Sequence, residues 1–366
     1  MNKREQEFQT KLDRVRRFCV DNDFDAIVIA SVPNFRWLTS GVISTVSRNS
    51  KIGDVTLYIT MSKVYLLTNC IECPRLMERD MPGIQVDYVV FPWYRSFKSE
   101  LDTLPGTRVA SDIPLPHCSY ISDEIRQLRY PMTDWEQERY ITLGRDAASV
   151  VEDVAKVLHP GMTTREISKQ IDCALIENDM FPIVSLVGAD DFQLRYRHPI
   201  PDSTALHKTA MVVVCAERDG LVVALTRTVH FGPLTTTQKQ MHRDVQWIHT
   251  AILTATRPGR HTQEIFRAIE DAYRRAGYPE EWKNHHQGGG IGYESRDFIL
   301  GPDVNEFVHL YQAFAWNPSI PGYKSEDTFL LTQEGPVCVT DSKSNWPRTR
   351  AREGDCVVTQ ADILEL

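Results

Sequence analysis

The sequence predicts two domains, an α/β domain followed by an α+β domain whose two halves are related by pseudo-two-fold symmetry. At 366 residues the chain is longer than one compact domain usually is. Strand and helix patterns alternate up to about residue 130. Beyond that point two similar stretches begin 98 residues apart, at Pro160 and Pro258. We therefore expect domains at residues 1–130 and 131–366.

The first domain has the patterns of a small mixed sheet with helices. A helix with one apolar face is predicted over residues 3–21. The short, β-branched run 25–31 predicts a buried strand. Two strand patterns on either side of residues 61–63 predict a hairpin, and residues 86–91 predict a further strand.

The second domain repeats one unit, in which a helix, a Pro-Gly turn and a second helix are followed by a hairpin. PGMTTREI (160–167) and PGRHTQEI (258–265) share Pro-Gly and then Thr, Glu and Ile at the same offsets. Hairpin turns are predicted at residues 219–220 and 334–335. The helix before the first repeat is expected to place the valines at 150, 154 and 157 on its apolar face.

Composition and charge exclude several classes of protein. Hydrophobic residues make up 42% and charged residues 25% of the chain, as in ordinary globular proteins. The net charge is -8 without a basic block, so neither nucleic acid nor an anionic membrane is an expected partner. The N-terminus lacks the apolar run of a signal peptide, and the eight cysteines are scattered. We expect a cytoplasmic protein with reduced thiols.

Several motifs, in order, resemble the creatinase/aminopeptidase P family, which has the pita-bread fold. They are PGMTTREI, the hairpin end LTRTVHFG, the glycine-rich GGGIGYESRD, and YKSEDTFLLTQEGPVCVT. VPNFRWLTSG also resembles the N-terminal domain of creatinase-type proteins. The family includes methionine aminopeptidases, Xaa-Pro peptidases and creatinase. The resemblance implies a pita-bread second domain and covers nearly the whole chain.

The resemblance also implies the positions of the family's metal ligands, which are two Asp, one His and two Glu. In this sequence they fall near Cys215, on Ala224, on Gly289, on Asn317 and on Glu326. Only Glu326 keeps a ligand of the family type. Bridging carboxylates hold a pair of divalent ions by neutralising their charge. We therefore expect no metal and no other cofactor.

Two further residues gain a role from the resemblance. His198 falls where the family keeps a His that contacts the substrate near the scissile bond. Arg296 falls where creatinase has an Arg that holds the substrate carboxylate, a task that suits the planar guanidinium fork. A surface ion pair of Arg296 with Glu294 or Asp297 is the alternative interpretation.

His285 and His286 precede the glycine-rich turn. Because side chains alternate along a strand, we expect only one of the two to face the site. Cys215 could act as a nucleophile beside a His, although a buried strand cysteine is more often inert packing.

The favoured function is a metal-independent, creatinase-like hydrolase that cleaves a C–N bond of a small carboxylate-bearing substrate, of amidino, ureido or amide type. His198 would be the general base, because a neutral imidazole can activate water near pH 7. The predicted catalytic residues are His198, His286 and Glu326, and the predicted substrate-binding residues are Arg296, Asn317, His285 and Cys215.

Two other functions remain open at this point. One is an Xaa-Pro dipeptidase- or aminopeptidase-like metallopeptidase with an altered site, for which His198, Cys215, His286 and Glu326 are the candidate ligands. The other is a non-catalytic protein that binds a peptide or metabolite. The sequence alone does not separate binding from turnover.

The resemblance further implies a homodimer in which the N-terminal domain of one subunit reaches the active site of the other. Two N-terminal loops carry aromatic and Arg residues, the types enriched in interface hot spots. Arg36 or Arg95 is expected near the partner's site. The alternative is that Trp37 and Trp93 close the core of their own domain.

Overall fold

The structure is a computed structural model that describes residues 2–81 and 83–366. The chain divides into two compact units, Met1–Trp135 and Glu136–Leu366, so the predicted boundary after residue 130 lies inside the first unit. Each unit has its own sheets and core. Within the described residues, no helix combines the length and the apolar character needed to cross a bilayer.

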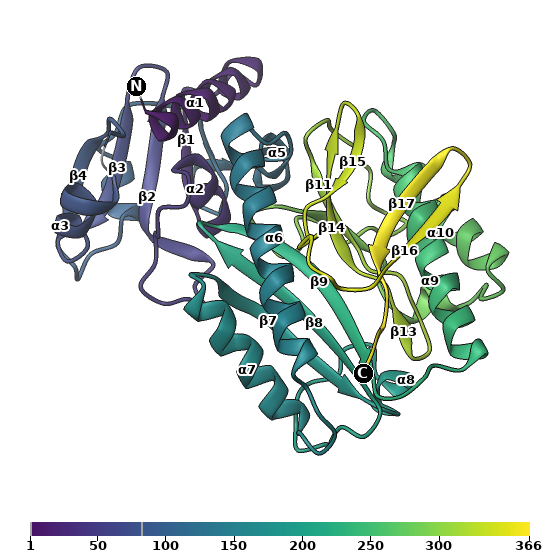
Figure 1. The fold of residues 1–366 in the computed structure, drawn as a ribbon. Coiled ribbons are helices and arrows are strands. Elements are labelled where there is room, and N and C mark those ends of the chain that lie inside the picture. The colour runs from purple at the N-terminus through teal and green to yellow at the C-terminus, as the bar shows by residue number, and fades with distance from the viewer. Residues whose placement is uncertain (1, 82) are drawn as a thin grey trace. The chain divides into compact units, whose positions relative to one another are not determined.

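The N-terminal unit is built on a six-stranded mixed sheet with the order β4-β3-β2-β1-β5-β6 (Figure 1). The central pairs β1–β2 and β2–β3 are antiparallel, and the outer pairs are parallel. The predicted helix, first strand and hairpin are all present. The elements are α1 (Lys3–Asp21), β1 (Ala26–Ser31), α2 (Val32–Leu38), β2 (Ile52–Thr60), β3 (Val64–Asn69), α3 (Cys73–Arg75), η1 (Leu76–Asp80), β4 (Asp87–Phe91), α4 (Lys98–Leu101), β5 (Val109–Ser111), β6 (Cys118–Tyr120) and α5 (Ser122–Leu128).

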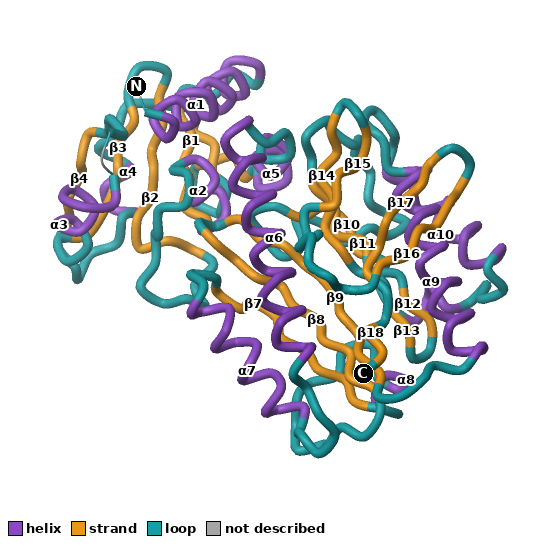
Figure 2. Tube along the Cα trace, in the orientation of Figure 1, coloured by secondary structure: helices purple, strands orange, loops and turns teal. Residues whose placement is uncertain are grey.

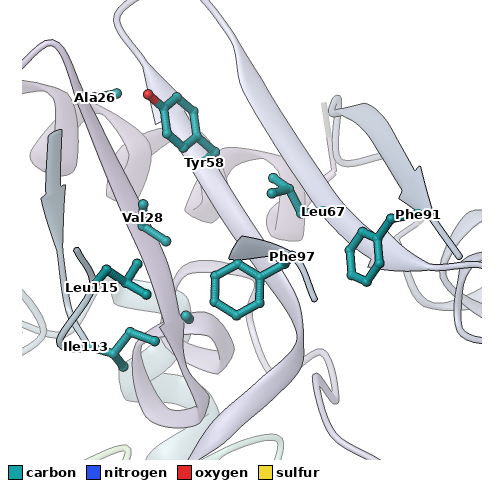
Figure 3. Close-up of a cluster of buried hydrophobic side chains, with 9 residues drawn as sticks. Ala26, Val28, Tyr58, Leu67, Phe91, Phe97, Ile113 and Leu115 are labelled. Carbon is teal, nitrogen blue, oxygen red and sulfur yellow. The ribbon is translucent and has the colours of Figure 1, made fainter. Parts of the chain in front are cut away.

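Local sequence explains where this unit begins and where its core forms. The side chain of Asn2 accepts a hydrogen bond from the Glu5 backbone N–H at 2.9 Å, and Glu5 bonds back to Asn2, which caps α1. Buried side chains on one face of the sheet make a core cluster, drawn in Figure 3. Its larger members are Val28, Tyr58, Leu67, Phe91, Phe97, Ile113 and Leu115.

The C-terminal unit has two four-stranded sheets, in the orders β18-β9-β8-β7 and β10-β11-β14-β15. Figure 2 shows its helices around these strands. Helix α7 packs on β7, and α9 and α10 pack on each other beside β11–β13 and β16. The elements are α6 (Asp134–Lys156), α7 (Thr164–Glu177), β7 (Phe181–Ala189), α8 (Phe192–Arg195), β8 (Thr209–Arg218), β9 (Leu221–His230), α9 (Thr236–Ala255), α10 (Thr262–Arg275), η2 (Glu281–Asn284), β10 (Gly288–Ile291), β11 (Ala313–Trp316), β12 (Ser319–Ile320), β13 (Tyr323–Lys324), β14 (Asp327–Thr332), β15 (Gly335–Cys338), β16 (Arg348–Glu353), β17 (Cys356–Ala361) and β18 (Leu364–Glu365).

The internal repeat seen in the sequence is a repeat in three dimensions. Helices α7 and α10 both begin with a capping box, closed by Glu166 on Thr163 and by Glu264 on His261. The glycine of the turn before each helix donates an equivalent backbone hydrogen bond. The Gly161 N–H donates to the Leu206 carbonyl and the Gly259 N–H donates to the Val308 carbonyl, each at 2.8 Å. The two halves of the unit are therefore built alike.

Both predicted hairpins form, and they bring the two sheets together. In the first, Cys215 on β8 lies opposite Ala224 on β9. In the second, β14 pairs antiparallel with β15. The Thr226 backbone N–H donates to the Glu326 carbonyl at 3.0 Å, so the residue directly before β14 is held against β9.

The apolar face of α6 differs from the prediction. The helix buries Leu143, Ala147 and Val151, whereas Val157 is 67% exposed. Helix α6 ends at Lys156, so Val157 lies beyond its last turn. The buried stripe is set by Tyr140, whose hydroxyl donates to the Val222 carbonyl on β9 at 2.7 Å.

A buried ion network fastens α6 to both sheets. Arg227 on β9 donates to Glu152 on α6 at 2.8 Å and to Asp327 on β14 at 2.9 Å. It also donates to the Thr340 carbonyl at 2.8 Å. Burial opposes the charge of Arg227, but the two carboxylates outweigh it and raise its pKa. Removing Arg227 would leave two buried carboxylates without their cation.

We expect Arg227→Met to lower the free energy of unfolding of this unit by about 3–5 kcal/mol, because breaking a buried pair leaves an uncompensated charge. Arg274→Met is the matched control, since Arg274 makes an exposed ion pair with Asp271 and should change stability by less than about 1 kcal/mol. Urea unfolding followed by tryptophan fluorescence measures both. If Arg227→Met lowered the free energy of unfolding no more than Arg274→Met does, the buried ion network would add nothing to stability.

Candidate active site

Loops and strand ends from both halves of the C-terminal unit converge on one cluster of polar side chains. From the first half, His198 follows α8 and Cys215 lies on β8. The second half supplies the other predicted residues from four places between η2 and β14. They are His285 and His286 between η2 and β10, Arg296 after β10, Asn317 after β11, and Glu326 between β13 and β14.

Three histidines form the outer part of this cluster. One ring nitrogen from each of His198, His285 and His286 lies within 4.8 Å of the other two. The Nε2 atoms of His198 and His285 are 3.1 Å apart, and Nδ1 of His285 is 2.9 Å from the Ser319 hydroxyl. His198 is exposed and His285 is buried, so the cluster leads from solvent into the protein.

The expectation that only one of the adjacent histidines faces the site is wrong. The ring centroids of His285 and His286 lie 4.9 and 5.6 Å from that of His198. Strand alternation does not apply here, because His285 caps the short 3₁₀ helix η2 and β10 begins only at Gly288. Both histidines can therefore approach the same point.

All three imidazoles are held in the neutral form at neutral pH. Burial, followed by the charge of Lys324, lowers the pKa of His198 and lowers that of His285 to about 2. Burial and the charge of Arg296 lower the pKa of His286 to about 4. Neutral imidazoles can accept a proton or bind a metal ion.

Glu326 is the buried anion of the site. Its Oε2 accepts from the Lys324 ammonium at 2.8 Å and from the Thr226 hydroxyl at 2.7 Å. Its Oε1 accepts from Arg296 at 2.9 Å. Burial alone would raise its pKa, but Lys324 and Arg296 outweigh burial and lower the pKa to about 2. Glu326 is therefore a carboxylate with both oxygens engaged.

Lys324 is the site residue that the sequence analysis missed. Its side chain is only 3% exposed, which is rare for lysine. The signal in the sequence was its place in YKSEDTF, where it stands two residues before Glu326 in a segment that resembles the family. Residues two apart on an extended segment point the same way, so a lysine there can reach the carboxylate.

The remaining predicted residues lie at the same cluster with different properties. Arg296 pairs with Glu326 rather than making only the surface pair considered as the alternative. Burial raises the pKa of the Cys215 thiol to about 11, so this thiol is not an activated nucleophile.

Asn317 is 1% exposed, and its Oδ1 accepts no hydrogen bond from the described residues. Asn317 thus offers a free acceptor beside the glycine-rich strand β10.

Comparison with known proteins identifies the family. Residues 140–333 match metallopeptidase family M24. The chain belongs to metallopeptidase family M24. An Xaa-Pro dipeptidase from Pyrococcus horikoshii is 20% identical over 357 residues, which cover 91% of this chain and 97% of the relative. Family membership makes the chain a peptidase-like hydrolase, within a group of enzymes that cleave C–N bonds.

Solved structures give the same fold over nearly the whole chain. A prolidase from Pyrococcus horikoshii OT3 superimposes with a TM-score of 0.76 at 18% identity, covering 92% of this chain and 99% of the prolidase. The N-terminal domain of the FACT complex subunit SPT16 from chickpea (Cicer arietinum) matches with a TM-score of 0.71 at 13% identity, over 93% and 97% of the two chains. The predicted pita-bread fold, with an α/β domain before it, is confirmed.

The M24 metal site does not fit the residues that this chain places there. An added Cβ at Gly289, where the resemblance of the sequence places the family histidine, would lie 2.1 Å from the Phe298 carbonyl oxygen. Ala224 has no ligand atom, and it faces the buried, protonated Cys215. Both oxygens of Glu326 already pair with cations. A carboxylate-bridged pair of divalent ions would therefore lack most of the ligands that it needs.

The close approach at Gly289 can be tested by stability. We expect Gly289→Ala to lower the free energy of unfolding by about 1–3 kcal/mol, because β10 must move away from the Phe298 carbonyl. Gly301→Ala is the control, since a Cβ there meets nothing within 4 Å and the change should cost less than about 0.5 kcal/mol. Thermal unfolding of the two variants makes the comparison. A Gly289→Ala protein as stable as the control would show that a side chain can enter this position.

Proposed function

We propose that this chain is a metal-independent, creatinase-like hydrolase that cleaves a C–N bond in a small carboxylate-bearing substrate. One observation carries the proposal: a neutral, exposed His198 stands beside a buried carboxylate that is flanked by two cations. The histidine supplies a base, and the cations supply positive charge for an anionic substrate and for the oxygen of the scissile group.

His198 is the general base of the proposed reaction. Nε2 of His198 is engaged with His285, which is itself fixed by Ser319. In the tautomer in which His198 donates this Nε2–H, its Nδ1 is free to take a proton from water. The resulting hydroxide oxygen bonds to the scissile carbon, the C–N bond breaks, and the proton passes to the leaving nitrogen. His286 lies close enough to assist this transfer.

Arg296 and Glu326 take the roles of anchor and orienting group. Arg296 gives one N–H to Glu326, and its Nε has no hydrogen-bond partner among the described residues. Arginine has five N–H donors, so Arg296 can bind a substrate carboxylate without leaving Glu326. The free oxygen of Asn317 is available for a polar atom of the scissile group, whereas both ring nitrogens of His285 are already engaged, with His198 and with Ser319.

We expect His198→Ala to lower turnover about 10²-fold or more, measured on substrates found by screening N-acyl, N-carbamoyl and N-amidino amino acids. His159→Ala, an exposed histidine after α6, should keep full activity. Because the pKa of His198 is lowered, the acidic limb of the pH–rate profile should fall below pH 6.5. Full activity of His198→Ala would remove this residue from the mechanism. Saturable binding without any hydrolysis would favour the binding-protein alternative.

A metallohydrolase with an altered site is the second candidate, and the histidine cluster is the observation that favours it. Three imidazoles are the donor set of some catalytic zinc sites, and the 3.1 Å between two Nε2 atoms leaves them close enough to share one ion. The ligands differ from the predicted set, because Cys215 is a buried thiol and Glu326 is already paired. Lys324 and Arg296 oppose a cation here, which is why we place this candidate second.

Elemental analysis separates the two candidates. For the metal-independent enzyme we expect far less than one Zn, Mn, Fe or Co per chain, and activity unchanged by a chelator. The metallohydrolase predicts about one ion per chain, lost in His285→Ala and kept in the control His159→Ala. A stoichiometric ion with chelator-sensitive activity would overturn the main proposal.

We also propose that the protein is a homodimer. Of the two tryptophans considered, Trp37 is fully buried and closes the core of its own unit, whereas Trp93 is 65% exposed beside the 70% exposed Tyr94. Exposed neighbouring aromatic residues support a contact surface around Trp93. Arg95, two residues away, is then the better candidate than Arg36 to approach the partner's site.

Light scattering should report about twice the 41.9 kDa chain mass at micromolar concentration. Trp93→Ser should shift the protein toward the monomer by weakening the contact, while Trp247→Ser, outside the N-terminal unit, should leave the mass unchanged. A wild-type monomer with full activity would exclude both the dimer and a site shared between subunits.

A further inference from the structure

Lys324 places a fixed positive charge at the centre of the site. Its side chain is 3% exposed, and the Nζ atom lies 2.8 Å from Glu326 Oε2. Lys324 also pairs across strands β12 and β13 with Ser319, the residue whose hydroxyl contacts His285. One backbone ladder thus holds the ammonium group and the histidine cluster in a fixed relation.

The charges at this cluster do not cancel. Lys324 and Arg296 are two cations, and both bind the single carboxylate of Glu326, whose two oxygens are fully engaged. The same three charges act on the pKa values of His198, His286 and Cys215. Asp297, the residue after Arg296, acts on the pKa of Tyr140 together with Arg296. With neutral histidines, Lys324, Arg296 and Glu326 together carry one positive charge in excess.

We propose that Lys324 is a specificity-determining residue, and that the excess charge restricts the substrate to anions whose scissile group is itself uncharged. The class is then a ureido or amide derivative of a small carboxylic acid, and amidino compounds are excluded. This inference rests on the proposed function, of which it selects one substrate class among three.

The exclusion follows from like-charge repulsion. An amidino group is protonated at neutral pH and would bring a third cation beside Lys324 and Arg296. A guanidinium is bound most strongly by carboxylate oxygens, which accept its N–H groups and balance its charge, and both oxygens of Glu326 are already used. A ureido group has nearly the same shape without the charge. Juxtaposed like charges that are shielded from water discriminate strongly between such partners.

A matched pair of ligands tests the charge alone. N-carbamoylglycine and N-amidinoglycine differ only in the exchange of a carbonyl oxygen for a protonated imino group. Titration calorimetry with the wild-type protein should show that N-carbamoylglycine binds at least about tenfold more tightly. Equal binding, tighter binding of N-amidinoglycine, or binding of neither at millimolar concentration would overturn the assigned class.

Variants then test whether Lys324 is the cause. Lys324→Met removes the excess charge and should abolish the tenfold preference, whereas Lys324→Arg should keep it. The double variant Lys324→Met/Glu326→Gln restores the excess of one positive charge through Arg296, and should keep the preference even if the single variant folds poorly. Lys239→Met is the control, because Lys239 pairs with Glu365 on the surface. A full preference in folded Lys324→Met, or its loss in the double variant, would refute the role of the charge.

Binding and turnover separate this inference from the function on which it rests. A preference for N-carbamoylglycine without any release of ammonia or amine keeps the charge selection and refutes the hydrolase. Hydrolysis of N-amidinoglycine at a rate similar to that of N-carbamoylglycine keeps the hydrolase and refutes the charge selection.

Discussion

The buried carboxylate of Glu326 stays ionised because Lys324 and Arg296 flank it, and this triad organises the rest of the site. Lys324 ends β13, Glu326 lies between β13 and β14, and Arg296 lies in the loop after β10. Thr226 on β9 adds a further element. Removing the carboxylate would leave two cations without a partner inside the protein, an unfavourable state. The triad therefore holds β9, the loop after β10 and the segment before β14 together at the site.

The same strands connect the site to the core through neighbouring residues. Thr226 and Glu326 bond to each other on the side of the site, whereas Arg227 and Asp327 bond to each other on the opposite side, toward Glu152 on α6. Successive side chains of a strand point to opposite faces, so each strand takes part in both networks. The position of the candidate site thus depends on the packing of α6.

The chain keeps the architecture of the M24 family, but the positive charge in its site belongs to its own side chains. Where the family fold holds ions between carboxylates, this chain has Ala224, a protonated Cys215 and a closed strand at Gly289. Fixed ammonium and guanidinium groups now supply positive charge beside neutral histidines. Such groups are already oriented before a substrate arrives, which is the condition for electrostatic stabilisation of developing negative charge.

Hydrophobic periodicity, turn residues and the internal repeat were sufficient to predict the fold class and the hairpins, because these features depend on short sequence patterns. The loss of the metal ligands is implied only by the resemblance to the family's motifs. The fold and family are confirmed, while the roles of His198, Arg296 and Glu326 stay predictions. Only the tertiary structure decided which stripe of α6 is buried, and that His285 and His286 both approach His198. It also revealed Lys324 as the partner of Glu326. These facts depend on contacts between segments far apart in the chain, and local propensity carries no information about which charges meet there.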